Sequence, residues 1–186
     1  MNGTTVTNNG STFLRTIQIP SKVANRIEQA ATNGPWWYLP DCAHEIGHEL
    51  QKSLNPYFSC TLLKDGISKD HIHNYDLNFF NRYIGLGNRN MIRAHVTFHW
   101  PRPEHFGVPH NAHVDQPYPH TVALYYVNDT DGDTVFFDKD DLTKVIHRET
   151  PKKGKCVVFD GQYAYHASTS PSKNIRMTLN INYENL

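Results

Sequence analysis

Two histidines and one aspartate form a candidate metal site. In His113-Val114-Asp115 an imidazole and a carboxylate stand two residues apart, and residues at that spacing in a strand point to the same side. His166 follows Asp115 by 51 residues, within another strand-like segment, 163–168. Two imidazoles and one carboxylate on one face of an octahedron suit Fe(II) and leave three coordination positions open for a cosubstrate and oxygen.

Arg176 follows His166 by ten residues and begins a run that alternates strictly between polar and apolar residues. One face of this predicted strand carries Arg176, Thr178, Asn180 and Asn182, and the other carries Met177, Leu179, Ile181 and Tyr183. An arginine in a strand usually faces solvent, but the preceding His166 favours an interior position. A buried guanidinium beside the metal needs an anionic partner, which a dicarboxylate cosubstrate would supply.

A rival metal motif lies earlier in the chain. His44-Glu45-Ile46-Gly47-His48 matches the His-Glu-x-x-His pattern of zinc metalloproteases, and chance would give only roughly 0.02 occurrences in a chain of this composition. It lies on a predicted helix from Asp41 to about Leu54, where the histidines point away from the apolar stripe of Cys42, Ile46, Leu50 and Leu54. Only 43 residues precede it, and no third ligand stands out among Asp70, His71 and His73. We favour an inert, solvated histidine pair and keep the zinc metalloprotease as the alternative.

Several segments from Ile92 to Tyr183, about half of the chain, resemble the Fe(II)- and 2-oxoglutarate-dependent oxygenases, with the prolyl-hydroxylase-like branch closest. The order and spacing of the segments carry the resemblance. They are His113-Val114-Asp115, Ala123-Leu124-Tyr125-Tyr126-Val127-Asn128, Gly132-Asp133-Thr134-Val135-Phe136, Gly154-Lys155-Cys156-Val157-Val158-Phe159-Asp160, His166 and Arg176-Met177-Thr178-Leu179. Gly132-Asp133 departs from the paired glycines that the family often has, which affects the expected turn and not the ligands.

This resemblance implies a double-stranded β-helix, or jelly-roll, core. It implies that His113, Asp115 and His166 are the iron ligands and that Arg176 binds the distal carboxylate of 2-oxoglutarate. Tyr126 is then a hydroxyl donor to the same carboxylate, and Thr178 is a weaker addition to that pocket. The implied cofactors are Fe(II), 2-oxoglutarate as cosubstrate and O2, with ascorbate as a further candidate.

The implied activity is hydroxylation of a C–H bond in a prolyl or other residue of a peptide or protein. Small-molecule substrates such as free amino acids stay open, because substrates lie against loops and loops vary freely on a shared scaffold. A β-barrel that binds a ligand without turnover is the non-enzymatic alternative.

The elements expected before residue 91 are mainly helical. We expect residues 1–12 to be a mobile lead-in and residues 13–186 to form one domain, with helical support over about 21–90 and a β core over about 91–186. The N-terminal part reads as a strand at 13–19 and a helix at 21–34, with Ser21 as N-cap and Gly34 as a left-handed stop. An aromatic link follows, whose Trp36 and Trp37 we expect in the core. The stretch 55–90 reads as irregular with a short helix.

From residue 91 the pattern is typical of β-structure. Short apolar runs separated by turn residues predict strands at 92–100, 112–115, 121–127, 134–137, 143–148, 155–159, 163–168 and 176–183. Strands at this spacing predict a mostly β, closed or double-sheet architecture with the N-terminal helices packed outside it.

The composition limits the classes of function. Lys+Arg and Asp+Glu both number 18, so no broad positive surface favours nucleic acid or an anionic membrane. No apolar run is long enough for a membrane span, and a soluble cytoplasmic protein is expected. Cys42, Cys60 and Cys156 are too far apart for a metal knuckle and are expected as free thiols. Five other histidines could line the mouth of a pocket or lie at the surface: His95, His99, His105, His110 and His120. We expect most of these five to lie at the surface.

Overall fold

Two antiparallel sheets face each other in the computed structural model, which describes residues 4–8, 11–40 and 56–185. The main sheet has the order β1-β2-β10-β7-β12-β6-β4-β3, with β5 paired to β4. Its strands are β1 (Thr4–Asn8), β2 (Ser11–Gln18), β3 (Trp37–Leu39), β4 (Tyr57–Lys64), β5 (Ile67–Ser68), β6 (Met91–His99), β7 (His120–Tyr126), β10 (Lys155–Asp160) and β12 (Arg176–Glu184). The small sheet has the order β11-β8-β9, made of β8 (Thr134–Asp138), β9 (Asp141–Glu149) and β11 (His166–Ser168).

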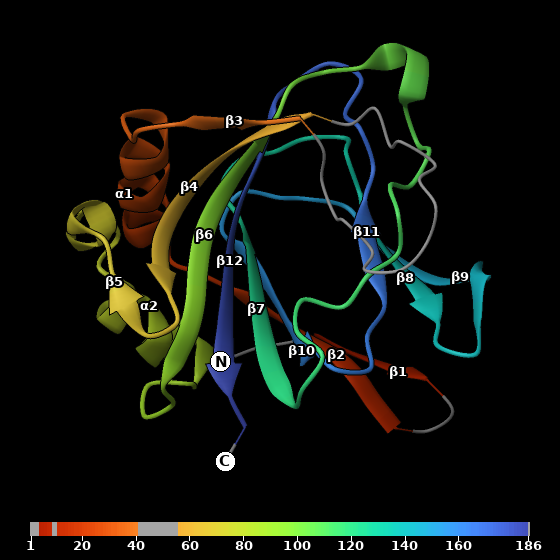
Figure 1. The fold of residues 1–186 in the computed structure, drawn as a ribbon, viewed down its shortest axis with the longest axis horizontal. Coiled ribbons are helices and arrows are strands. Elements are labelled where there is room, and N and C mark those ends of the chain that lie inside the picture. The colour runs from red at the N-terminus through yellow and green to blue at the C-terminus, as the bar shows by residue number, and fades with distance from the viewer. Residues whose placement is uncertain (1–3, 9–10, 41–55, 186) are drawn as a thin grey trace.

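Helices cover the outer face of the main sheet, and the small sheet lies on its other side (Figure 1). They are α1 (Ser21–Thr32), α2 (Leu77–Ile84) and the 3-10 helix η1 (Asp70–Tyr75); a second 3-10 helix, η2 (Pro103–His105), lies in the loop after β6. In α1 the apolar spacing produces a buried stripe of Val23, Ala24, Ile27 and Ala31. The predicted mostly β class with helices outside the sheet is confirmed.

The alternation predicted for β12 divides its residues between two environments. Leu179, Ile181 and Tyr183 are fully buried in the core between the main sheet and the helices. The even-numbered residues point the other way, between the two sheets. There a second apolar cluster, Leu14, Val122, Leu124, Tyr126, Phe136, Val157, Phe159 and Ala164, fills one part of the interior and leaves the rest to polar side chains.

The N-terminal half contributes more β-structure than the sequence predicted. Where a mobile lead-in was expected, residues 4–8 form β1, paired with β2, and the β-branched residues of Thr4-Thr5-Val6-Thr7 favour an extended backbone. The short helix predicted within 55–90 is present as α2, but the prediction that the rest of the stretch is irregular is wrong, because β4 pairs with both β6 and β3 there. A register shift between Thr61 and Leu63 buries the adjacent Leu62 and Leu63, and this bulge breaks the alternation by which a strand is recognised.

Smaller differences concern turns and the aromatic link. Pro20, not Ser21, is the N-cap of α1, and Gly34 is not among the glycines with positive φ. Gly34 instead packs tightly, since a Cβ there would lie 3.2 Å from the Ala30 carbonyl oxygen. Trp36 packs against the core as expected, but Trp37 is 53% exposed on the edge strand β3, so that half of the prediction is wrong.

Three further points concern the thiols, the predicted second helix and membranes. Cys60 and Cys156 are free, as predicted, and both are buried. The predicted helix from Asp41 to Leu54, with Cys42, lies outside the described residues. In the part of the chain that the structure describes, no helix has both the length and the apolar character needed to cross a membrane.

Replacing Ile181 by alanine should strongly destabilise the fold. Its side chain is fully buried in the core between the main sheet and the helices, and truncating such a side chain costs about 2–5 kcal/mol through lost burial and the cavity that remains. The matched control Leu142→Ala, on β9 and 39% exposed, should change the free energy of unfolding by less than about 0.5 kcal/mol. Urea denaturation measures both, and equal effects would contradict this division between core and surface.

Candidate functional site

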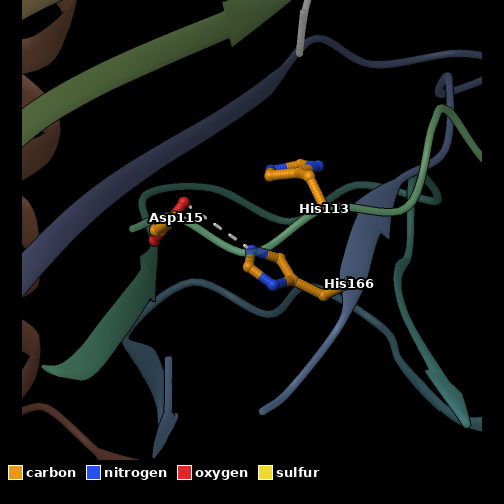
Figure 2. Close-up of side chains that lie close together, drawn as sticks. All are labelled: His113, Asp115 and His166. Atoms are coloured by element: carbon orange, nitrogen blue, oxygen red, sulfur yellow. Dashed lines mark ion pairs between the residues drawn. The ribbon is translucent and has the colours of Figure 1, made fainter. Parts of the chain in front are cut away.

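The three predicted metal ligands come together at one end of the space between the sheets (Figure 2). One ligand atom each of His113, Asp115 and His166 lies within 4.8 Å of the other two. His166 begins β11, whereas the strand predicted at 112–115 is wrong, because His113 forms only a single bridge to His166. In that bridge each residue's backbone N–H donates to the other's carbonyl, at 3.0 and 2.9 Å, which holds the two imidazoles side by side.

Backbone carbonyls orient both imidazoles. Nδ1 of His113 lies 3.0 Å from the Asn111 carbonyl oxygen, and Nδ1 of His166 lies 2.9 Å from that of Ala164. A carbonyl can only accept, so each Nδ1 carries a proton, and in the neutral ring the lone pair is then on Nε2. Both rings are therefore in the tautomer that binds a metal through Nε2.

Two amides from β12 hold the carboxylate of Asp115. Its Oδ2 accepts hydrogen bonds from Nδ2 of Asn180 at 2.9 Å and from Nδ2 of Asn182 at 2.8 Å. Its Oδ1 lies 4.0 Å from Nε2 of His166. One oxygen is thus occupied by the protein, and the other faces the imidazoles, where a cation would bind.

The electrostatics favour the unprotonated forms that bind a metal. Burial, helped by the neighbouring His113, lowers the pKa of His166 from its ordinary 6.5 to about 4. Burial alone would raise the pKa of Asp115, but His166, His113 and Arg93, with the Asn180 hydrogen bond, hold it well below its usual value. At neutral pH His166 is therefore neutral and Asp115 is ionised, and the donor set of these two residues with His113 fits a divalent cation.

A cavity of about 300 Å³ extends from this site. It is lined by Tyr57, Arg93, His95, Thr97, His99, His110, His113, Val114, Asp115, Leu124, Thr134, His166, Ser168, Arg176, Thr178 and Asn180. The polar face of β12 therefore does face the interior, as the alternation predicted. Asp115 is the one acidic residue in this lining.

Arg176 lies in this cavity and is 3% exposed. Its Nε donates to the Gly132 carbonyl at 2.9 Å, and its Nη2 donates to Oγ1 of Thr134 at 2.8 Å. Gly132 permits this approach, because a Cβ there would lie 3.1 Å from Cδ of Arg176 and 2.9 Å from the Thr169 carbonyl oxygen. A guanidinium oriented in this way suits a carboxylate.

The other two predicted cosubstrate residues lie nearby in different positions. Thr178 lines the cavity, and its hydroxyl forms a 2.7 Å hydrogen bond with that of Thr97. Tyr126 is fully buried and donates its hydroxyl to Oγ1 of Thr134 at 2.9 Å, so it contacts the same threonine as Arg176. The sequence reasoning missed Thr134 and Thr97, although Thr97 belongs to the alternating run 93–99, which could have indicated it.

The prediction that most of the remaining histidines lie at the surface is wrong. His95, His99 and His110 are at most 9% exposed and line the cavity, and His120 is fully buried. His95 and His99 lie on the inward face of β6, while His110 hydrogen-bonds Ser168 and Ser170. Burial, with nearby positive groups, lowers the pKa of His95 and of His110 to about 3, so both rings are neutral.

The rival motif of His44, Glu45 and His48 lies outside the described residues, so the protease stays a prediction. Of its possible third ligands, His71 bonds the Thr61 carbonyl at 2.7 Å through Nε2. Over residues 4–8, 11–40 and 56–185, His113, Asp115 and His166 form the one group that could hold a metal ion.

No family model and no curated protein matches this chain. Among solved structures, an oxidoreductase of the 2OG-Fe(II) oxygenase family from Burkholderia pseudomallei is similar at TM-score 0.67 and 14% identity, over 91% of this chain and 84% of that one. A prolyl hydroxylase from Trichoplax adhaerens, in complex with a hypoxia inducible factor peptide fragment, has TM-score 0.61 and 15% identity, with 91% and 82% coverage. A viral collagen prolyl hydroxylase from Paramecium Bursaria Chlorella virus-1, solved as a 2-oxoglutarate complex, has TM-score 0.54 and 14% identity, with 96% and 98% coverage.

At these identities the similarity concerns the fold. The chain has the double-stranded β-helix fold of the 2OG-Fe(II) oxygenases, as the resemblance in the sequence predicted.

Removing any one of the three predicted ligands should abolish tight metal binding. His113→Ala, Asp115→Ala and His166→Ala should each lower Fe(II) affinity at least about a hundredfold, because loss of outer-shell partners alone costs 10–100-fold. Anaerobic calorimetry measures the affinity, and circular dichroism checks the fold. Exposed His73→Ala is the control, and replacing His44 and His48 by glutamine should also leave binding unchanged. Metal binding that depends on His44 and His48 instead would support the protease.

The metal-free protein should lose stability as the pH falls from about 6.5 towards 4. Burial lowers the pKa of His166 from 6.5 to about 4, so the unfolded chain takes up the proton first. Stability is therefore complete above about 6.5 and declines as acid protonates the unfolded state; His95 and His110 act in the same direction. Urea midpoints between about pH 7.5 and pH 4 measure this slope. The dependence of the urea midpoint on pH should be weaker in His166→Gln than in the wild type and unchanged in His73→Gln. A urea midpoint that does not change with pH would contradict the burial of neutral histidines.

Proposed function

We propose that this protein is an Fe(II)- and 2-oxoglutarate-dependent oxygenase that hydroxylates a C–H bond. The observation that carries the proposal is the presence, in one cavity, of an oriented His-Asp-His triad and a buried arginine. Either feature alone has other uses. Together they match a metal that keeps open positions and a cosubstrate with a remote carboxylate.

In this proposal His113 and His166 bind iron through Nε2, and Asp115 binds it through Oδ1. Asn180 and Asn182 stop the Asp115 carboxylate from rotating. When bound, Fe(II) would supply the redox chemistry by which O2 and 2-oxoglutarate yield succinate, CO2 and a hydroxylated product. The triad remains oriented by the protein, which limits the reorganisation that metal binding requires.

Arg176 binds the distal carboxylate of 2-oxoglutarate in this scheme. Its guanidinium is anchored through Gly132 and Thr134, so little side-chain entropy is lost when the carboxylate arrives. Thr178 contributes a hydroxyl from the same wall. Tyr126 stays our candidate second donor, and its bond to Thr134 also fixes the threonine that Arg176 uses.

For the substrate we propose a prolyl or other residue of a peptide or protein. Support comes from the similar fold of a prolyl hydroxylase solved with a peptide fragment. Small molecules are the second class of substrate, and ascorbate belongs to the proposal only as a reductant. We expect no nucleic acid and no membrane partner, since the chain has no net charge.

The decisive measurement is formation of succinate from 2-oxoglutarate by the protein with Fe(II) under air. The wild type should form succinate, and His113→Ala should not. Arg176→Leu should raise the 2-oxoglutarate requirement about tenfold or more, because it removes a charge-assisted contact. Tyr126→Phe should do so more mildly. The iron-loaded wild type is assayed with and without proline-containing peptides and free amino acids. If it forms no succinate under any of these conditions, the result would indicate the non-catalytic barrel.

A further inference from the structure

A second arginine lies in the wall of the same cavity. Arg93 belongs to the inward face of β6, followed along that face by His95, Thr97 and His99. These residues pair in register with Asn182, Asn180, Thr178 and Arg176 of β12. Asn182 and Asn180 hold Asp115, so Arg93 lies at the metal end of the wall, whereas Arg176 lies at the opposite end.

Asp115 is the one acidic residue of the wall that acts electrostatically on Arg93, and in the proposed complex its carboxylate also binds the metal. The side chain of Arg93 is partly buried, and across the described residues it forms no hydrogen bond or ion pair. The one acidic residue of the lining, Asp115, has Oδ2 bound to two amides and Oδ1 directed at the imidazoles. Next to Arg93, Nδ1 of His95 is buried without a hydrogen-bond partner. Across the described residues, neither of these two polar groups is therefore hydrogen-bonded by the protein itself.

The charges of the proposed complex identify what is missing. The charges of Fe(II) and Arg176 are balanced by those of Asp115 and the 2-oxoglutarate dianion. With the charge of Arg93 added, the cavity carries one positive charge in excess, and it is lined mainly by polar groups and is open to solvent. A partly desolvated charge without a partner is costly, so the second ligand of this cavity should bring a single negative charge.

We propose that the substrate carries a carboxylate that binds Arg93, so that it is a free amino acid or a chain presenting a carboxylate, and not a neutral internal residue. A carboxylate matches the guanidinium fork and supplies one charge, whereas a phosphate monoester would bring nearly two. This inference rests on the proposed oxygenase function and specifies its substrate class. It also separates the two arginines by role, with Arg176 for the cosubstrate and Arg93 for the substrate.

Matched pairs of compounds test this proposal. The common free amino acids, and acetylated tripeptides with a free C-terminus, are each compared with their C-terminal carboxamides. Binding is measured by saturation-transfer NMR with the Zn(II)-loaded protein and 2-oxoglutarate, and turnover by 2-oxoglutarate consumption and gain of one oxygen with Fe(II). Compounds with a carboxylate should bind and stimulate turnover, and their carboxamides should not. The C-terminal carboxamides of Asp and Glu keep a side-chain carboxylate. If they still bind, Arg93 accepts a side-chain carboxylate as well as a terminal one.

Arg93 variants assign the effect to this residue. Arg93→Leu should weaken binding of the best carboxylate at least about tenfold and remove its advantage over the carboxamide. Arg93→Lys should restore part of the affinity. Lys64→Leu is the matched control, because Lys64 pairs with Arg93 in β4 but is exposed and does not line the cavity. It should bind the same carboxylate within about twofold of the wild type.

Three results would overturn the inference. They are carboxamides that bind as well as the acids, no binding by any carboxylate tested, and Arg93→Leu binding like the wild type. Failure of the oxygenase proposal is recognised separately, because the iron-loaded wild type would then consume no 2-oxoglutarate with any compound. The NMR comparison would still report on Arg93 in that case.

Discussion

The burial of one carboxylate constrains the rest of this structure. The side chain of Asp115 is 5% exposed, and an isolated ion at such a position costs several kcal/mol. It is tolerated because Asn180 and Asn182 donate to one oxygen while the imidazoles of His113 and His166 stand beside the other. The same contacts join the loop after β6 to the middle of the main sheet. The candidate metal site and the closure of the barrel at this end thus depend on one set of hydrogen bonds.

The main sheet separates two different interiors. Its outer face carries the aliphatic residues that pack against α1 and α2 and provide the hydrophobic stabilisation. Its inner face carries the arginines, threonines, asparagines and histidines of β6 and β12, matched across the two strands in register. Because the apolar core lies on the helix side, the inner face can be polar without the loss of a hydrophobic core. A cavity lined by polar and charged side chains is therefore compatible with a stable core in a chain of 186 residues.

Much of the fold could be predicted from residue 91 onward, where regular alternation and turn residues mark most of the strands. Prediction failed where alternation is broken or a segment is short. The bulge at Thr61 and Leu63 concealed β4, and β3 has only three residues. The segment around His113 shows the opposite error, because a strand-like pattern there forms only one bridge to β11. Each of these errors arises where a long-range pairing, and not local preference, decides the backbone conformation.

The sequence by itself determined the three candidate ligands, Arg176 and the polar face of β12, because side-chain direction in a strand has a period of two residues. It could not determine that His95, His99 and His110 are buried, nor that Arg93 faces the same cavity. Those positions depend on which strands become neighbours, and β6 and β12 are paired although they lie far apart in the chain. The tertiary structure alone decided which polar faces meet, because hydrogen bonding between strands joins residues that no local pattern relates.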